Sequence, residues 1–503
     1  MDIPVVDLKS FLIDPEITQL VPEDMVRRHI LLPLFRIKNT LTVAIADPYN
    51  VPAIDEVERY TQCQVDTVVA NREQILEAID QQFGHESVAD IVKGIDGIDL
   101  QTVKEESVDV KEVQKIAEEP PLIRLVNLIV LKAIDQGASD IHIEPSRDRL
   151  RVRYRLDGKL QEVQSLPKAL QASVAARIKI MSNLDIIERR RPQDGRITVK
   201  VRNREVDLRV STFPANLGET IVIRVLDKDT GLLSLDGLGF PQEALARARA
   251  LIRRPNGIVL VTGPTGSGKT STLYAALHEI NVPTINIITM EDPVEYQLDG
   301  INQGQINPGV GLTFADGLRS ILRQDPNVIF VGEIRDLETA EIAVRASLTG
   351  HLVFSTLHTN DAPSTVSRLI DIGIQPYLLA SSLLGILAQR LVRRVCQECQ
   401  QPDDQAMAQA KQLGLSLPSG SHFVRGNGCS ACHSMGYKGR IGLFELLEIT
   451  PEIASLIAKR ADTDEIRKAA QRAGMKMLRD DGLLKAAAGQ TTLEEVLSIT
   501  QPG

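Results

Sequence analysis

Eight consecutive residues near the middle of the chain have the types and spacing of a phosphate-binding loop. They read Gly-Pro-Thr-Gly-Ser-Gly-Lys-Thr, which matches glycine, any four residues, glycine, lysine, and serine or threonine. The glycines let backbone N–H groups curl around phosphate oxygens, the lysine reaches the outer phosphates, and the final hydroxyl holds Mg²⁺. The pattern predicts an ATP and Mg²⁺ site made by Gly263, Pro264, Thr265, Gly266, Ser267, Gly268, Lys269 and Thr270.

Two glutamates and a histidine follow apolar runs further along the chain. Glu291 follows the run 284–290, Glu333 comes one glycine after the run 328–331, and His358 ends a third run. At the carboxyl end of a parallel strand, a carboxylate can orient a water molecule or the ligands of Mg²⁺. We expect Glu333 to be the main catalytic carboxylate, Glu291 to be a second one, and His358 to sense the outer phosphate. The alternatives are an ordinary acidic loop and a structural histidine.

Four of the five cysteines form two pairs with the spacing of metal-binding knuckles. Cys396 and Cys399 make one pair, Cys429 and Cys432 make the other, and 29 residues lie between the pairs. Four thiolates satisfy tetrahedral Zn²⁺, which then has a structural rather than a catalytic role. Disulfides are not expected in a chain without an export signal. A redox pair or reduced thiols are the alternatives to zinc.

Arginines gather in residues 120–230. An oligomeric triphosphatase needs a cation, often supplied by a neighbouring subunit, to neutralise charge on the transferring phosphoryl group. We favour Arg209 and Arg224 for this catalytic role because each ends or follows a predicted strand, although the sequence does not rank them above Arg196. Surface arginines that only promote solubility are the alternative. The arginines of this region include Arg189, Arg190, Arg191, Arg196, Arg209 and Arg224.

The phosphate loop needs a strand before it and a helix after it. Residues 257–262 are apolar and β-branched, and residues 271–277 have helical spacing, so a chance match of a glycine-rich turn is disfavoured. The runs at 284–290, 328–331 and 350–360 predict further strands of one α/β sheet. The apolar stretch 378–395 contains three arginines and predicts a packed helix. Short amphipathic helices are predicted at 452–460, 463–473 and 493–500.

The chain divides into several segments along its 503 residues. The segment 86–119 has ten acidic residues and four lysines, which is typical of a mobile linker, and a tether without specific partners is the simplest interpretation. Alternating apolar residues predict hairpins at 34–45 and 197–210, and helices are predicted at 55–60, 72–83 and 122–136. The segments are an N-terminal partner-docking domain (1–85), the acidic linker (86–119), an arginine-rich α/β domain (120–230) and an ATPase core (235–503) with a zinc element (390–440) and C-terminal helices (450–503).

Composition limits the possible partners. The net charge is −9, and the chain lacks tryptophan and has few other aromatic residues, which disfavours nucleic acid as a partner. The N-terminus has no basic stretch followed by an apolar core, and no window is apolar enough to span a membrane. We therefore expect a cytoplasmic protein that reaches a membrane only through partners.

The chain resembles the secretion and pilus ATPases, the motors of type II secretion and type IV pilus assembly. The stretch 322–336 resembles the signature and Walker B region of that family, with Asn327 in place of the usual aspartate. The stretch 289–295 is similar to its aspartate box, the stretch 350–361 to its histidine box, and the four cysteines also match. The resemblance covers roughly residues 120–503.

The resemblance implies a hexameric ring beneath an inner-membrane platform protein, with cytoplasmic docking proteins as further partners. It implies a RecA-like core and a PAS-like arginine-rich domain that closes over ATP, with Arg209 and Arg224 near the triphosphate. The cysteines and the long N-terminal region favour the assembly or secretion branch over the retraction branch. Some N-terminal domains of the family bind cyclic-di-GMP through an Arg-Leu-Gly motif, which is missing from residues 1–85, so partner docking is the better interpretation.

Two other functions compete with a pilus or secretion motor. Related ring ATPases move nucleic acid, but the acidic charge and the absence of basic patches interleaved with aromatic residues oppose that function here. A scaffold with a degenerate nucleotide site conflicts with the intact Lys269, Thr270 and Glu333. The motifs do not separate type II secretion from type IV pilus assembly.

Overall fold

The structure is a computed structural model of the chain. It describes residues 6, 8, 15–18, 20–37, 39–48, 50–83, 116–117, 119–201, 204–227, 234–413, 415 and 420–500. Most of the predicted acidic linker (86–119), namely residues 86–115 and 118, lies outside the described residues. The chain forms two compact units, Met1–Thr230 and Gly231–Gly503.

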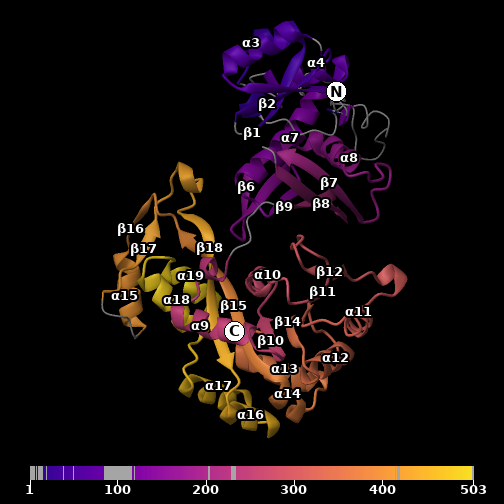
Figure 1. Cartoon of the computed structure of the whole chain (residues 1–503). Coiled ribbons are helices and arrows are strands. Elements are labelled where there is room, and N and C mark those ends of the chain that lie inside the picture. The colour runs from indigo at the N-terminus through magenta and orange to yellow at the C-terminus, as the bar shows by residue number, and fades with distance from the viewer. Residues whose placement is uncertain are drawn as a thin grey trace. The chain divides into compact units, whose positions relative to one another are not determined.

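The first part of unit one is built on a three-stranded sheet (Figure 1). Strands β1 and β2 form the predicted antiparallel hairpin, and β3 pairs in parallel with β2. Buried aliphatic side chains such as Leu32, Val43 and Ile75 make its core. Both predicted helices are confirmed. The elements are α1 (Pro15–Thr18), α2 (Glu23–His29), β1 (Leu31–Ile37), β2 (Thr40–Ile45), α3 (Val51–Thr61), β3 (Gln64–Val69) and α4 (Arg72–Phe83).

The second part of unit one is an antiparallel sheet in the order β6-β5-β4-β9-β8-β7. In β5, Leu150, Val152 and Tyr154 are buried and alternate with arginines, so one face is apolar and the other charged. The Tyr154 hydroxyl donates to the carbonyl oxygen of Ile129 at 2.5 Å, which ties α7 to the apolar face. The elements are α7 (Pro120–Asp135), β4 (Asp140–Pro145), β5 (Arg149–Leu156), β6 (Lys159–Pro167), η3 (Lys168–Leu170), α8 (Gln171–Met181), β7 (Gln193–Val201), β8 (Arg204–Ala215) and β9 (Gly218–Asp227).

Unit two is built on a sheet in the order β12-β11-β13-β14-β10-β15-β18. All neighbouring strands run parallel except β18, which is antiparallel to β15. Every residue of β10 is buried, as expected for a central parallel strand. The carboxyl ends of β11, β13, β14 and β10 therefore lie next to one another at one edge. The strands are β10 (Gly257–Thr262), β11 (Ile287–Glu291), β12 (Asn302–Gln305), β13 (Val328–Val331), β14 (Leu352–Leu357), β15 (Leu383–Val395), β16 (Gln400–Pro402), β17 (Val424–Gly426) and β18 (Tyr437–Glu448).

Helices cover both faces of this sheet (Figure 1). Ile258 and Leu260 of β10 pack in one cluster with α12 and α13, whereas Val259 and Val261 pack in another with α9 and α10. The predicted α/β class is thus confirmed. The helices are η4 (Leu235–Leu238), α9 (Gln242–Ile252), α10 (Lys269–Ile280), η5 (Pro308–Val310), α11 (Phe314–Ile321), α12 (Leu337–Leu348), α13 (Ala362–Ile372), α14 (Pro376–Ser382), α15 (Asp404–Gln412), η6 (Ser430–Cys432), α16 (Pro451–Ala458), α17 (Thr463–Arg472), α18 (Leu478–Ala487) and α19 (Leu493–Thr500).

The helix predicted at 378–395 is wrong over most of its length. The short helix α14 ends at Ser382, and the following 13 residues form the strand β15. β15 lies between β10 and β18, so both of its faces are largely buried and it lacks the polar alternation of a half-exposed strand. Within the predicted C-terminal helices, α18 was not named individually; its buried Asp481 and Lys485 form an ion pair 2.5 Å long.

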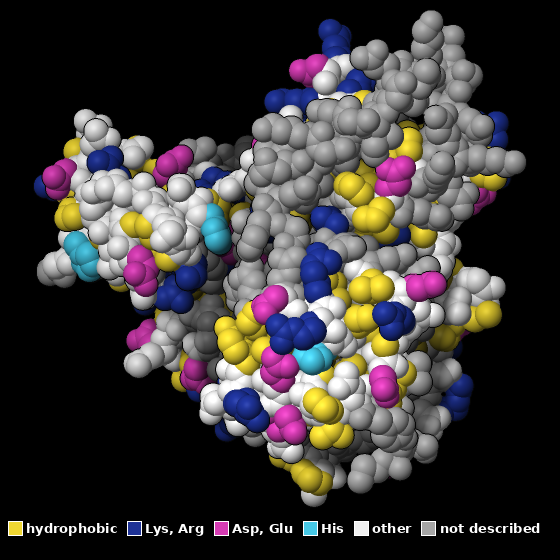
Figure 2. Space-filling view, turned by 90° about the horizontal axis from the view of Figure 1, so that it is seen from above, with side chains coloured by type: hydrophobic (Ala, Val, Ile, Leu, Met, Phe, Trp, Pro, Cys, Tyr) yellow, Lys and Arg dark blue, Asp and Glu magenta, His cyan; other side chains and the backbone are white. Residues whose placement is uncertain are grey.

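Charged side chains of both signs are interspersed on the face in Figure 2, so the described residues there form no extended basic patch. Within the described part of the chain, no helix is long and apolar enough to cross a bilayer.

Candidate functional site

The phosphate loop joins β10 to α10 and has the geometry of an anion cradle. Gly263, Gly266 and Gly268 have φ angles of 152°, 79° and 87°, in the region that favours glycine. A Cβ on Gly263 would lie 2.5 Å from the backbone oxygen of Gln389, so no other residue fits there. In the described part of the chain, the buried Ser267 Oγ has no hydrogen-bond partner. A phosphate oxygen in this cradle would supply that partner, so the loop fits a nucleotide.

The side-chain amine of Lys269 is hydrogen-bonded to carbonyl oxygens of the phosphate loop. Its Nζ donates to the carbonyl oxygens of Gly263 at 2.7 Å and Pro264 at 3.1 Å, and lies 3.5 Å from His358 Nδ1. Burial lowers the pKa of Lys269 to about 8, against the opposing effect of Glu333 and with a further lowering by Arg390. An arriving phosphate would replace these carbonyl oxygens with a stronger partner.

Glu333 and His358 come from neighbouring strand ends and contact each other. His358 Nε2 lies 3.1 Å from Glu333 Oε2, and Arg335 pairs with the other carboxylate oxygen. Because β14 lies between β10 and β13, His358 forms a bridge from Lys269 to Glu333. The structure therefore brings together three predicted site residues, and the carboxylate of Glu333 with the hydroxyl of Thr270 is a donor set of the kind that suits Mg²⁺.

Glu291 lies at the end of β11, the strand next to β13, and both of its carboxylate oxygens are hydrogen-bonded. It ends β11, is 2% exposed, and accepts a short hydrogen bond from the Tyr274 hydroxyl. Its other oxygen accepts from Thr289 Oγ1 at 2.6 Å and Gln303 Nε2 at 3.1 Å. Burial, followed by the bond to Glu291, raises the pKa of Tyr274 well above its usual value. The Tyr274 hydroxyl therefore stays protonated and fixes the position of Glu291.

Two acids of the neighbouring motifs are helix caps. Asp336 accepts from Thr339 N at the start of α12, and Asp361 accepts from Ser364 N at the start of α13, both at 2.8 Å. Each cap stabilises a helix that follows directly from the site. His351 likewise contacts the carbonyl oxygen of Ala346 at 2.9 Å, at the opposite end of β14 from His358.

Arg390 is a residue of this site that the sequence analysis missed. It is buried, and its guanidinium donates to Asn360 O at 2.9 Å and to Gln389 O at 3.0 Å. Its Nη1 would lie 3.1 Å from a Cβ on Gly263, so Arg390 lies against the phosphate loop. An arginine within the apolar run 378–395 could have indicated this role, but the run predicted a helix rather than a strand.

The favoured arginines form a row across the six-stranded sheet. Arg196 pairs in register with Arg209, Arg209 with Arg224, and Arg224 with Asp140. These four residues line a hollow of about 380 Å³. Asp140 binds Arg224 at 3.4 Å and, on its other side, Arg155 at 3.3 Å. Among the residues that the structure describes, no carboxylate pairs with Arg196 or Arg209.

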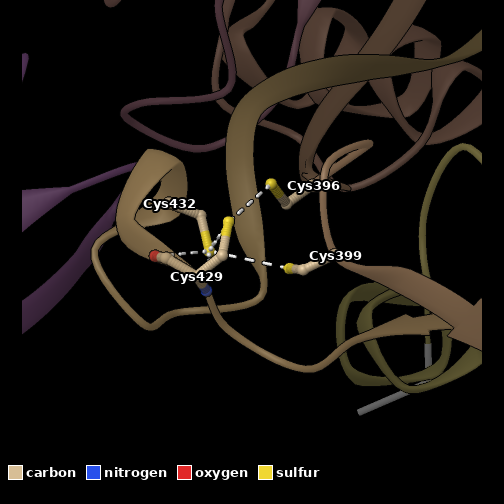
Figure 3. Close-up of side chains that lie close together, drawn as sticks. All are labelled: Cys396, Cys399, Cys429 and Cys432. Atoms are coloured by element: carbon tan, nitrogen blue, oxygen red, sulfur yellow. Dashed lines mark hydrogen bonds between the residues drawn. The ribbon is translucent and has the colours of Figure 1, made fainter.

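The four cysteines converge from two knuckles (Figure 3). All their sulfur atoms lie within 4.8 Å of one another. Sγ–Sγ distances are 3.8 Å for Cys396–Cys429, 3.8 Å for Cys399–Cys432 and 3.7 Å for Cys429–Cys432. A tetrahedron with metal–sulfur bonds of about 2.3 Å has edges of about 3.8 Å. The cluster therefore fits a tetrahedral metal ion, whereas these distances are too long for disulfides.

Comparison with known proteins identifies the family. Residues 115–498 match the family described as Type II/IV secretion system protein, and residues 1–89 match the MshEN domain. The chain belongs to the type II/IV secretion system protein family. The type IV pilus assembly ATPase PilB of Myxococcus xanthus is 46% identical over 99% of this chain and 89% of that protein. The type II secretion system protein E of Pseudomonas aeruginosa is 46% identical over 90% of each chain.

Solved structures agree with this assignment. The pilus retraction motor PilT with bound ADP is 28% identical, with a TM-score of 0.50 over 74% of this chain and 96% of that one. The Legionella pneumophila ATPase DotB, at 22% identity and a TM-score of 0.54 over 74% of this chain and 94% of that one, shows the fold alone. The prediction of an ATPase related to pilus-assembly and secretion ATPases is confirmed, and the chain is an ATPase of this family.

Proposed function

We propose that this chain is the subunit of a cytoplasmic hexameric motor that hydrolyses ATP to assemble pilins or pseudopilins in type IV pilus biogenesis or type II secretion. The observation that carries this proposal is the line from Lys269 through His358 to Glu333 at adjoining strand ends. The amine of Lys269 and the carboxylate of Glu333 thus both contact His358, which supports binding of the outer phosphate and Mg²⁺ at this point. The chain that contains these three residues is 46% identical to a pilus assembly ATPase and to a type II secretion protein E.

Each part of the core site has a role in this proposal. When bound, ATP would be the substrate and Mg²⁺ would neutralise the charge that develops on the transferring phosphoryl group. The N–H groups of residues 265–270 would bind the phosphates, and Lys269 would turn from the loop carbonyl oxygens to the outer phosphate. Thr270 and Glu333 would hold Mg²⁺ and its water ligands, and His358 would sense the outer phosphate. Glu291 is the second catalytic candidate, and the Tyr274 hydroxyl positions it.

The arginine row is the part of the proposal that requires a second subunit. Like charges directly opposite one another in a sheet are unfavourable, so binding of an anion would stabilise the row of arginines. We infer that Arg209 and Arg224, with Arg196 beside them, reach the triphosphate of the neighbouring subunit and stabilise its charge during transfer. We also infer a PAS-like fold for this domain, because its antiparallel sheet carries helices on one face and charges on the other.

The cysteine cluster has a structural role in this proposal. We infer that Cys396, Cys399, Cys429 and Cys432 hold one Zn²⁺, whose coordination shell they fill. The metal would fix the loop between β15 and β18, which otherwise has a small core.

The N-terminal domain supplies contacts outside the ring. We infer that residues 1–85 dock onto a cytoplasmic partner and that the ring lies beneath an inner-membrane platform protein, which makes its membrane association indirect. We infer no role for nucleic acid, because the net charge is −9 and residues of both signs are mixed on the surface in Figure 2.

Stimulation of purified, full-length protein tests the proposed function. ATP hydrolysis is measured alone, with the platform protein of the same organism in vesicles, with protein-free vesicles, and with DNA. We expect stimulation by the platform protein only. Stimulation by DNA without any effect of the platform protein would favour the nucleic-acid-translocating ring ATPase. Deletion of the gene, scored for pili and for secreted proteins, separates the two pathways.

A further inference from the structure

Arg335 pairs with one carboxylate at the edge of the nucleotide site, and a second acid follows the neighbouring strand. Its Nη2 pairs with Glu333 Oε1. The hydrogen bond with Glu333 raises the pKa of Arg335, and the negative charge of Asp292 acts in the same direction. The strands explain this arrangement: Met290 of β11 pairs with Val331 of β13, and Asp292 and Glu333 each follow two residues later.

The backbone of Arg335 is fixed, whereas its side chain is not. The preceding residue, Ile334, is buried, and its N–H donates to Thr356 O at 3.1 Å. The following residue, Asp336, is the N-cap of α12. The side chain of Arg335 is 67% exposed, compared with 12% for Glu333. A change of partner at this position therefore requires only rotamer changes of one exposed side chain.

Both oxygens of Glu333 are bonded within the chain, one to Arg335 and one to His358. A carboxylate that holds Mg²⁺ can keep a hydrogen bond on a second lone pair, but the metal repels a guanidinium that pairs with the same group, so Mg²⁺ at Glu333 disfavours one of these partners. His358 is also in contact with Lys269 and is part of the line described above. The side chain of His358 is 49% exposed, whereas that of Arg335 is 67% exposed and always charged, so Arg335 is the partner that leaves.

We propose that Arg335 is a positioning residue that holds Glu333 until Mg²⁺ arrives and then passes to Asp292. This inference rests on the proposed role of Glu333 in Mg²⁺ binding. Arg335 then competes with Mg²⁺, and Asp292 favours the metal by accepting the displaced guanidinium. An exposed ion pair changes an equilibrium constant by up to about five-fold. Loss of the pair should therefore change the half-saturating Mg²⁺ concentration by about two- to five-fold.

Titration with Mg²⁺ tests the competition. Full-length protein binds a fluorescent, non-hydrolysable ATP analogue at increasing Mg²⁺ concentrations, and ATP hydrolysis is measured in parallel. Arg335→Gln should lower the half-saturating Mg²⁺ concentration by about two- to five-fold. Arg335→Lys should restore most of the original half-saturating Mg²⁺ concentration.

The matched control is Arg345→Gln. Arg345 lies on α12, has a side chain that is 77% exposed, and pairs with Glu341 at 3.7 Å. It should leave the Mg²⁺ requirement unchanged. An unchanged requirement in Arg335→Gln, or a loss of hydrolysis at every Mg²⁺ concentration, would overturn the proposal.

Asp292 gives a second test through a double-mutant cycle. Asp292→Asn should raise the half-saturating Mg²⁺ concentration in the native background, because the displaced Arg335 then loses its second partner. It should have no effect in the Arg335→Gln background. An equal increase in both backgrounds would mean that Asp292 acts on Mg²⁺ directly, which contradicts the exchange.

Glu333→Gln separates this inference from the proposed function. If Glu333→Gln hydrolyses ATP at the full rate, the proposed role of Glu333 is wrong and the inference fails with it. If Glu333→Gln is inactive while Arg335→Gln has the native Mg²⁺ requirement, only the exchange by Arg335 is wrong.

Discussion

The nucleotide site and the arginine row both gather charged side chains, but they balance those charges differently. In the nucleotide site, Lys269 is bonded to loop carbonyl oxygens, and Glu333 is bonded to Arg335 and His358. In the row, three arginines stand directly opposite one another, with Asp140 at one end. The first site is balanced within its own unit, whereas the hollow along the row is lined by three arginines and only two aspartates, Asp140 and Asp194.

This difference indicates which site is complete within one chain. A site whose charges are paired internally exchanges those partners for a ligand at little cost in desolvation. A row of like charges is unfavourable until an anion neutralises it. The hollow along the row, about 380 Å³, has room for phosphate groups. We therefore expect the row to complete a site on another subunit, and the following variants test each half of this comparison.

Removing the cation of the nucleotide site should have the largest effect. Lys269→Ala removes the amine that contacts both the loop and His358, so ATP hydrolysis should fall by roughly 10³-fold or more. Hydrolysis is measured by phosphate release from the purified protein. Lys468→Ala, at an exposed position on α17, is the control and should have native activity. Native activity in Lys269→Ala would mean that this loop is not the site of hydrolysis.

Removing one arginine of the row should have the next largest effect. Arg209→Ala or Arg224→Ala should each lower hydrolysis by about 100-fold, since the other arginines remain. Arg155→Ala is the matched control, because Arg155 binds the other side of Asp140 and lies outside the hollow. It should retain most of the activity.

Mixed assemblies then test whether the row serves another subunit. Alone, Arg224→Ala subunits should keep about one-hundredth of the native activity, and Lys269→Ala subunits should keep almost none. In a mixture, an intact Lys269 of one subunit can meet an intact Arg224 of its neighbour, so part of the activity should return. If mixing restores nothing, Arg224 does not act across a subunit boundary.

The two sites also differ in how far the sequence could predict them. The phosphate loop and the strands before Glu291 and Glu333 are local patterns, and each was predicted close to its observed position. The Arg196–Arg209 pair follows from the hairpin of β7 and β8, in which Val201 pairs with Arg204, by counting back equally along both strands. The Arg209–Arg224 pair follows in the same way from the turn at residues 216–217. Both pairs could have been found with the register of two-residue turns.

Other features depended on contacts that are distant in sequence. Asp140 meets Arg224 across 84 residues, and no local pattern predicts that pairing. The strand β15 was interpreted as a helix because a run buried on both faces has neither a helical nor a strand period. Arg390 was missed for the same reason. The bonds of Glu291 to Tyr274 and Gln303 likewise require the packing of α10 and β12 against β11.

The cysteine cluster extends the comparison, because its proposed ligand set is complete within one chain. The native protein should contain about one zinc ion per chain, measured by elemental analysis of freshly reduced protein. Cys396→Ser should lose the zinc and lower the melting temperature by a few degrees, whereas Cys63→Ser, outside the cluster, should keep the zinc. Native zinc content in Cys396→Ser, or no zinc in the native protein, would contradict the proposed site.

The pH dependence of ATP binding separates the two sites by the chemistry of their cations. Burial lowers the pKa of Lys269 to about 8, so the amine is charged below that pH and neutral above it. Guanidinium groups stay charged throughout this range. Affinity for a fluorescent ATP analogue should therefore be highest below pH 8 and fall by about ten-fold between pH 7 and pH 9. Lys269→Arg should remove most of this pH dependence, whereas Arg224→Ala should keep it. A native pH profile in Lys269→Arg would mean that another group titrates, and the lowered pKa of Lys269 would then not control binding.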